Sequence, residues 1–254
     1  MTGTRDPVRR AFLLGIAAFV ALDVAASPAA AQSEGFKNTV EAYLMGASMA
    51  GTVGAGPVST DIDVPSSTIF ENLKFAALLD YRGEAAKWAV AADVVYMNLG
   101  KAGTSDGGRV SADVGAEEFI VDLVGAYRIS KSFEVLAGGR YTGLNTTMTL
   151  YGPLNTREAK VNKSWVDPVV GAQAFLPLSE TFQLHLRGDL GGFDLGCKFT
   201  WQAMVRVNWQ VSPLIRLGVG YRWLDQDYES GSGSDYFRWT ILTQGPLVAA
   251  GVTF

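Results

Sequence analysis

In residues 200–223, apolar side chains occupy every second position on both sides of one short turn at 211–213. A period of two indicates β-strands, because successive side chains of a strand point to opposite faces of a sheet. Each arm has about ten residues, and at ~3.3 Å per residue with a tilt near 45° it rises roughly 23 Å. That rise matches the apolar thickness that a membrane-spanning strand must cross. The segment therefore predicts a long antiparallel hairpin.

Aromatic residues stand at the ends of the apolar face of this hairpin. Trp201 and Trp209 bracket the first arm, and Tyr221 and Trp223 end the second. Amphipathic rings are enriched where a membrane meets water, so their placement favours a transmembrane hairpin. A half-buried hairpin of a soluble sandwich shows the same alternation. The rest of the sequence is needed to decide between a transmembrane hairpin and a soluble one.

Residues 1–31 are typical of a cleaved signal peptide. Three arginines precede an apolar stretch at 11–22, and three alanines at 29–31 form a small-residue cleavage motif. We expect removal of this segment to leave one domain, residues 32–254. Arg9-Arg10 also fits a twin-arginine signal, which usually exports folded cargo, whereas a barrel reaches its membrane unfolded. General secretory export is therefore the preferred route.

The segment after the signal peptide contains no run of 18 or more apolar residues, so the sequence predicts no transmembrane helix. An exported chain of this kind is then a soluble periplasmic protein or a barrel. Short turns near 84, 131, 179 and 212 alternate with longer connections, which favours a barrel with short periplasmic turns and longer extracellular loops. The predicted strands are 39–50, 73–82, 88–96, 119–127, 133–148, 165–176, 182–190, 201–210, 215–224 and 236–254. The predicted long connections are 51–72, with a helical turn at 66–73 capped by a serine near Pro65, then 100–115, 151–163, 193–198 and 225–235.

The fold class expected from these strands is all-β, a single antiparallel up-and-down transmembrane barrel. Ten strands is the preferred count, with eight as the alternative because the first strand alternates weakly. An even count places both ends of the barrel on the periplasmic side. In the last strand the apolar parity changes between Ile241 and Val248, and a bulge at Gly245-Pro246 would correct it.

The C-terminal half resembles a family of outer-membrane β-barrel proteins of Gram-negative bacteria. The similarity is good over 165–254 and looser upstream, and Asp194, Cys197 and Lys198 depart from the pattern. It implies the fold and a location in the cell outer membrane, and brings no established reaction. It is carried by Trp165-Val166-Asp167-Pro168-Val169-Val170-Gly171, Gly188-Asp189-Leu190-Gly191-Gly192-Phe193, Phe199-Thr200-Trp201-Gln202, Gly220-Tyr221-Arg222-Trp223-Leu224-Asp225-Gln226-Asp227-Tyr228 and the terminal Gly-Val-Thr-Phe.

If the apolar faces contact lipid, the charged side chains of the strands face the lumen. The reason is cost, since an arginine facing lipid near mid-membrane is unfavourable by ~2–4 kcal/mol. The near balance of signs predicts a paired network that fills a narrow barrel, without the one-sign ring of an ion-selective pore. The basic set is Lys74, Arg82, Arg128, Arg140, Arg187, Arg206, Arg216, Arg222 and Arg238. The acidic set is Asp80, Asp93, Glu118, Asp122, Glu134, Asp167 and Asp189, with Glu41 as a further candidate.

Eight residues form the expected lumen charge network, with a structural role. Counting from the turn near 212 places Arg206 beside Gly218 and Asn208 beside Arg216, and makes Asp189 the leading candidate partner for Arg206 or Arg222. The network is Asp93, Asp122, Arg140, Asp189, His185, Arg187, Arg206 and Arg222.

The sequence predicts no catalytic, cofactor or metal site. His185 is the one histidine of the chain. Outer-membrane lipid A deacylases use a histidine with a nearby serine, but position 187 is arginine. Omptin-type proteases need a histidine near the outer rim, and His185 falls at mid-strand. The acidic residues 225–229 are interpreted as a solvated rim, with weak cation binding as the alternative, and Cys197 as a passive loop residue.

We therefore expect a non-enzymatic outer-membrane barrel with a side-chain-plugged lumen and a structural or surface-interaction role in the envelope. A narrow channel for small solutes is the alternative, and a lipid-modifying enzyme is the third. The partners expected are outer-membrane lipid and the barrel-assembly machinery, which would recognise C-terminal Phe254 with Val252. The sequence has no basic run for nucleic acid and leaves the oligomeric state open.

Overall fold

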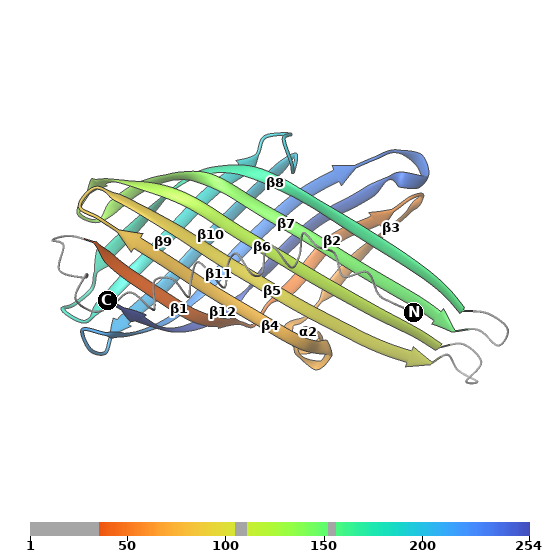
Figure 1. Cartoon of the computed structure of the whole chain (residues 1–254), viewed down its shortest axis with the longest axis horizontal. Helices are drawn as coiled ribbons and strands as arrows, with labels where there is room; N and C mark the ends of the chain where they lie inside the picture. The colour runs from red at the N-terminus through yellow and green to blue at the C-terminus, as the bar shows by residue number, and fades with distance from the viewer. Residues whose placement is uncertain (1–35, 105–110, 152–155) are drawn as a thin grey trace. The chain divides into compact units, whose positions relative to one another are not determined.

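The computed structural model describes residues 36–104, 111–151 and 156–254. Within them, ten of twelve antiparallel strands close into a barrel, which runs in order from β1 through β4 to β12 and is sealed by β1 pairing with β12 (Figure 1). The predicted count of ten barrel strands is confirmed. The barrel strands are β1 (Lys37–Met45), β4 (Leu73–Glu84), β5 (Trp88–Thr104), β6 (Ser111–Ser130), β7 (Phe133–Tyr151), β8 (Thr156–Pro177), β9 (Phe182–Gly192), β10 (Phe199–Gln210), β11 (Ile215–Ser230) and β12 (Phe237–Thr253).

Two further strands extend the barrel wall on one side, past the end opposite to the short turns. That end is called the upper end below. β2 (Ser48–Ala55) pairs with β12 beyond the point where β1 ends. Both strands pair with β12 in the same register, and the pairing is interrupted only opposite Pro246. β3 (Val58–Val64) folds back on β2, and the short helix α2 (Ser66–Asn72) leads into β4. The predicted helical turn is confirmed, but its N-cap is Pro65, without a side-chain cap bond, rather than a serine. Residues 51–64 are a hairpin and not a loop.

The predicted bulge in the last strand is wrong. β12 pairs with β11 in one unbroken register from Phe237 to Val252, so odd-numbered residues face inward along its whole length. Ile241 is 1% exposed and packs with Met49 of β2 and Ile69 of α2. The apolar residues of β12 switch from odd to even positions along the strand, because the odd positions in its first half face an upper lumen that is itself apolar.

The long loops expected near 107, 157 and 230 are mostly strand. β5 to β8 contain 17 to 22 residues each, whereas β9 and β10 contain 11 and 12. About 9–11 residues suffice to cross a membrane. β5 to β8 therefore continue as a raised sheet beyond the end at which β9 and β10 stop, and Figure 1 shows them running out to the right. β11, β12, β2 and β3 form a second raised sheet.

The exterior has an apolar band between two rows of aromatic residues. On β5, β6, β7 and β10 the outward aromatics lie eight residues apart, which corresponds to roughly 19 Å along the barrel axis. Outward pairs in contact include Trp88 with Tyr127, at 4.7 Å between ring centroids, and Phe75 with Tyr96, at 5.9 Å. Just beyond the upper row, polar groups take over, since Asn98 donates a hydrogen bond to outward-facing Glu117. The paired aromatics are Trp88 and Tyr96, Phe119 and Tyr127, Phe133 and Tyr141, and Trp201 and Trp209.

The expected signal peptide, residues 1–31, lies outside the described residues. In the described part of the chain, no helix is long and apolar enough to span a membrane.

Candidate functional site

A row of acidic side chains crosses one wall of the lumen from strand to strand. Glu41 pairs across the strands with Asp80, Asp80 with Asp93, and Asp93 with Asp122. The row then continues through Arg140 to Asp167. Like charges directly opposite on neighbouring strands are destabilising. This row therefore needs cations from elsewhere.

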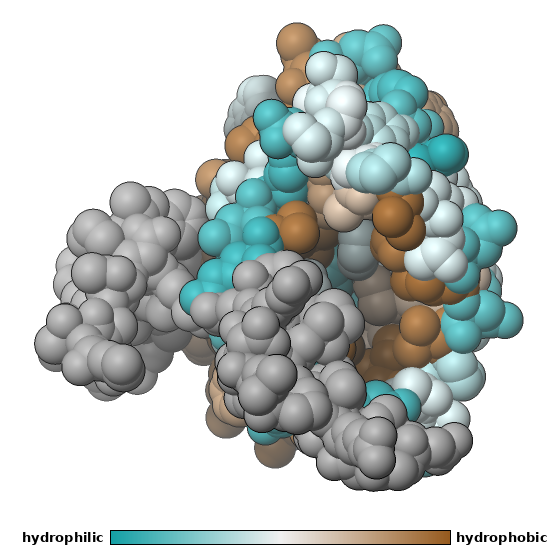
Figure 2. Space-filling view, turned by 90° about the vertical axis from the view of Figure 1, so that its right-hand side faces the viewer, coloured by the Kyte–Doolittle hydropathy of each residue, from teal (hydrophilic) through white to brown (hydrophobic). Residues whose placement is uncertain are grey.

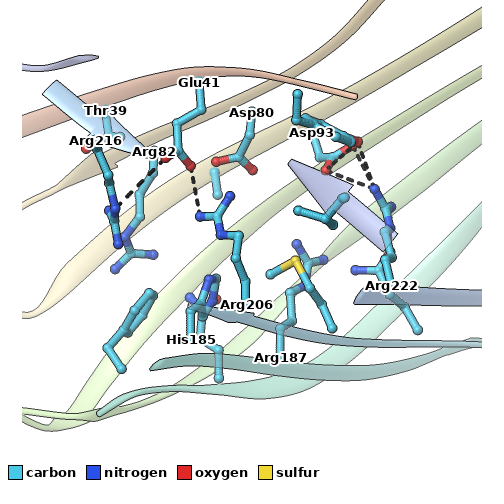
Figure 3. A pocket seen from close by; sticks show the side chains of 17 residues that line it. Thr39, Glu41, Asp80, Arg82, Asp93, His185, Arg187, Arg206, Arg216 and Arg222 are labelled. Atoms are coloured by element: carbon cyan, nitrogen blue, oxygen red, sulfur yellow. Dashed lines mark hydrogen bonds and ion pairs between the residues drawn. The ribbon is translucent and has the colours of Figure 1, made fainter. Parts of the chain in front are cut away.

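Arginines on the facing wall supply them. Arg206 on β10 reaches Glu41 on β1, with 2.8 Å between Nη2 and Oε2, and Arg222 on β11 reaches Asp93 on β5 at 3.1 Å. Figure 3 shows the two sets converging from opposite sides, with these pairs joined by dashed lines. None of these pairs joins neighbouring strands, so each one ties distant parts of the wall together.

Arg140 forms the centre of the network. Its Nε donates to Asp122 at 2.7 Å and its Nη2 to Asp189 at 2.8 Å, and Arg140 has no exposed surface. Arg187 bonds the same two carboxylates, at 3.4 Å and 3.0 Å. Two arginines and two aspartates thus close a buried box. In such a box the attraction repays the desolvation of the ions only if the remaining hydrogen bonds are also made, and Thr200 accepts one more from Arg140.

A second cluster closes the end of the lumen at which the short turns lie. Arg82 lies 2.7 Å from Glu134, and Arg128 lies 2.7 Å from Glu84. Gln173 donates a further hydrogen bond to Glu134. This end of the lumen is therefore filled by side chains as well.

An aromatic cluster covers the network at the other end. The rings of Trp165 and Tyr228 stack at 4.0 Å, and Phe237 and Leu144 pack beside them. Cys197 is fully buried in the same cluster, and its backbone N–H donates to Asp167. The expectation of a passive loop cysteine missed this contact. The sequence signal available was that Trp165 shares its strand face with lumen-facing Asp167.

His185 lies in the lumen near the short turns, in contact with an aromatic ring and an amide side chain. Its ring stacks on Phe175, at 4.3 Å between centroids, and its Nε2 bonds Gln173. It lines a cavity of about 40 Å³ with Arg206 and Arg216 (Figure 3). At roughly 10–15 Å³ per water, that space holds about three to four water molecules. No group of three metal-ligating side chains occurs among the described residues.

The structure places all eight residues of the expected network on the inner face, but the expected partners differ. Arg206 bonds Glu41, whereas Asp189 bonds Arg140 and Arg187. The expected register is off by two, because Arg206 pairs with Gly220 rather than Gly218. The turn between the strands is longer than the count assumed.

Two residues of the larger lumen set do not face the lumen. Lys74 is exposed at an irregularity in the pairing of β4 with β5, beside Leu73. Arg238 lies on the outward face of β12, since the expected bulge is absent, and its Nε is 3.5 Å from Glu229. Glu229 also holds Lys198 at 2.6 Å. The hydrogen bond to Glu229 raises the pKa of Lys198, and Glu229 of the acidic rim is thus paired with two cations.

A scan against models of known families finds no match, and neither does a search of curated proteins. Several solved structures are similar in fold. The attachment invasion locus protein Ail of Yersinia pestis is 12% identical, with 87% of this chain and 99% of that chain covered and a TM-score of 0.37. The outer membrane protease OmpT of Escherichia coli is 10% identical, with 86% and 96% covered and a TM-score of 0.48. The translocator domain of NalP from Neisseria meningitidis is 11% identical, with 96% of each chain covered and a TM-score of 0.46.

The exterior of the barrel identifies its environment. The antiparallel sheet closes on itself through the pairing of β1 with β12, and an apolar band between two aromatic rows is the surface that an outer membrane requires. Large side chains such as Leu123 and Val219 are 63% and 58% exposed within this band. A soluble protein rarely exposes a continuous apolar surface of this extent. The chain is an outer-membrane β-barrel protein.

Proposed function

We propose that this protein is a non-enzymatic component of the outer membrane, with a closed lumen and a surface-interaction role carried by its raised sheets. The filled lumen is the observation that carries the proposal. Ion pairs cross it at several levels, and fully buried Arg140 lies at its centre. Two cavities among the described residues have volumes of about 40 and 70 Å³, and their small size supports a closed lumen.

The raised sheets support the surface role. β7 extends ten residues past Tyr141 of the upper aromatic row, which corresponds to roughly 23 Å. Its side chains there include exposed Asn145 and Thr146, which are suited to hydrogen bonding and not to lipid. Figure 2 looks onto this end, where mostly hydrophilic residues border a hollow with hydrophobic residues inside it. Such surfaces on rigid strands present a fixed face to a partner.

Planar-bilayer recording tests the closed lumen. We expect no steady conductance from the purified protein, whereas steady large conductance would favour the narrow channel and overturn the proposal. Mass spectrometry of lipid A from cells with and without the protein tests the enzyme alternative. In that experiment we expect no change in the lipid A species.

Amine labelling of intact cells tests which end faces outward. Lys101 lies on the raised sheet, and Lys87 and Lys131 lie in the short turns at the opposite end; all three are exposed. A membrane-impermeant reagent should label Lys101 on intact cells and should reach the other two only after the outer membrane is permeabilised. The reverse pattern would remove the surface role.

A further inference from the structure

The barrel wall has a gap between β1 and β4. These strands pair from Lys37–Glu84 up to Ala42–Leu79, and their described pairing ends there. Above that point β1 stays with β12 and β4 stays with β5. β3 and α2 bridge the two separated strands higher up. The result is a window in the wall.

An apolar cavity of about 70 Å³ lies at this window, and its lining includes residues from both faces of the wall. On the outside it is lined by Leu44 and Phe70, which are 63% and 52% exposed. On the inside it is lined by Ile120 and Leu224, each 4% exposed. One cavity therefore joins the lipid-facing surface to the lumen.

The window lies near the aromatic row on the side of the raised sheets, which is the height of the outer leaflet in the orientation proposed above. Ala76 lines the cavity and follows Phe75, which contacts Tyr96 in the upper aromatic row. Two charged side chains, Glu118 and Arg222, are among its described lining residues, at the inner end, where they are 7% and 4% exposed. Contact with hydrocarbon would desolvate these buried charges, which costs free energy. Glu118 and Arg222 therefore set how deep an apolar guest can enter.

We propose that the window binds the end of an unbranched acyl chain from the membrane, inserted tail first. The lips and the walls are apolar, as such a guest requires. An apolar cavity of about 150 Å³ holds benzene, so this one holds roughly the last three carbons of a chain. The rest of the chain lies along Leu44 and Phe70 in the lipid-facing lip. The acyl chain can come from a phospholipid or from a free fatty acid.

Photo-crosslinking tests the site. The full mature barrel is reconstituted in phosphatidylcholine vesicles with a phospholipid that carries a diazirine at the terminal carbon of one chain. A parallel sample receives a free fatty acid with the same group. We expect mass spectrometry to find label on lumen-facing Met97 or Ile120, and the sample in which it occurs identifies the source of the chain.

Matched variants separate specific from incidental labelling. Ala76→Phe fills the cavity and should lower label on Met97 or Ile120 at least five-fold, whereas Ala77→Phe, on the outward face of the same strand, should leave it unchanged. If Ala76→Phe does not fold, Ile120→Ala enlarges the cavity and should raise label on Met97 about two-fold. Label confined to outward residues such as Leu123, or unchanged by these cavity variants, would overturn the proposal.

Discussion

Arg140 is the residue on which the lumen network converges. It binds Asp122 and Asp189 without any exposed surface. Arg140→Ala would leave buried carboxylates without their main counter-ion, which we expect to lower the free energy of unfolding by about 3–5 kcal/mol. Urea unfolding in detergent micelles, followed by the loss of the heat-modifiable band, measures the change.

Two controls fix the meaning of that result. Arg238→Ala removes an arginine whose side chain is 37% exposed, and we expect a change of at most ~1 kcal/mol. His185→Ala should also cost much less than Arg140→Ala or Arg206→Ala, because His185 bonds an amide and stacks on Phe175, so its loss strands no ion. Equal destabilisation by all of these variants would argue against a network built on charge.

Cys197 offers a test at the outer end of the lumen. The thiol is buried beneath the aromatic cluster, and burial, aided by Asp167, raises its pKa well above the usual range. The thiolate is the reactive form, so the folded protein should resist maleimide at pH 8, whereas urea-unfolded protein should react within minutes. Rapid labelling of the folded barrel would show that the cluster does not close over this residue.

At the scale of the element, alternation alone predicted the ten strands and the inward face of Arg140, Asp122 and Arg222. It could not predict which residues pair across the lumen. Those partners depend on the stagger of the closed barrel, which no local pattern contains. Arg206 meets Glu41 from a strand three places away around the wall.

Two misreadings have a common physical cause. Residues 51–64 look like a loop because glycines and a proline interrupt the alternation. Yet 51–55 belong to a strand whose partner lies far away in β12, and 58–64 fold back on that strand. Ile241 looks lipid-facing because a polar lumen was assumed, but it packs inward on α2. Local rules fail where the upper lumen replaces charges with an apolar interior.

Inward glycines allow the strands to approach closely. A Cβ on inward-facing Gly171 would clash with the backbone carbonyl of Gly188, whereas on Gly139, on the outward face of β7, its nearest contact would be 3.8 Å away. Gly171→Ala must therefore move the backbone of β8 or β9, and we expect it to lower stability by ~1–3 kcal/mol, as overpacking does. Gly139→Ala should be close to neutral. The same unfolding assay compares the two.

The last strand also carries a prediction about assembly. The backbone of Phe254 exchanges two hydrogen bonds with Asn38 where the barrel closes, and its ring is outward and half-exposed. If the assembly machinery reads this ring, Phe254→Ala should lower the amount of folded barrel in cell membranes several-fold. Refolding of the purified variant in micelles should be unaffected. A loss in both assays would instead indicate a role in stability.

At the scale of the whole molecule, the inner face of the barrel has its acidic and its basic residues on different sides. Acidic residues form a continuous row on one part of it, and arginines from the other part neutralise them through the lumen. This arrangement explains why a ten-strand barrel of this sequence is filled rather than open. It is consistent with the proposal that the raised sheets carry a surface-interaction role.

A double-mutant cycle on Glu41 and Arg206 tests this account most directly. The two side chains are 2.8 Å apart, with β11 and β12 between their strands in the wall. If the pair joins the wall across the lumen, Glu41→Gln and Arg206→Met should each destabilise the barrel. The double variant should then recover part of the loss, with a coupling of roughly 1–3 kcal/mol. Strictly additive effects in the unfolding assay would contradict the central claim.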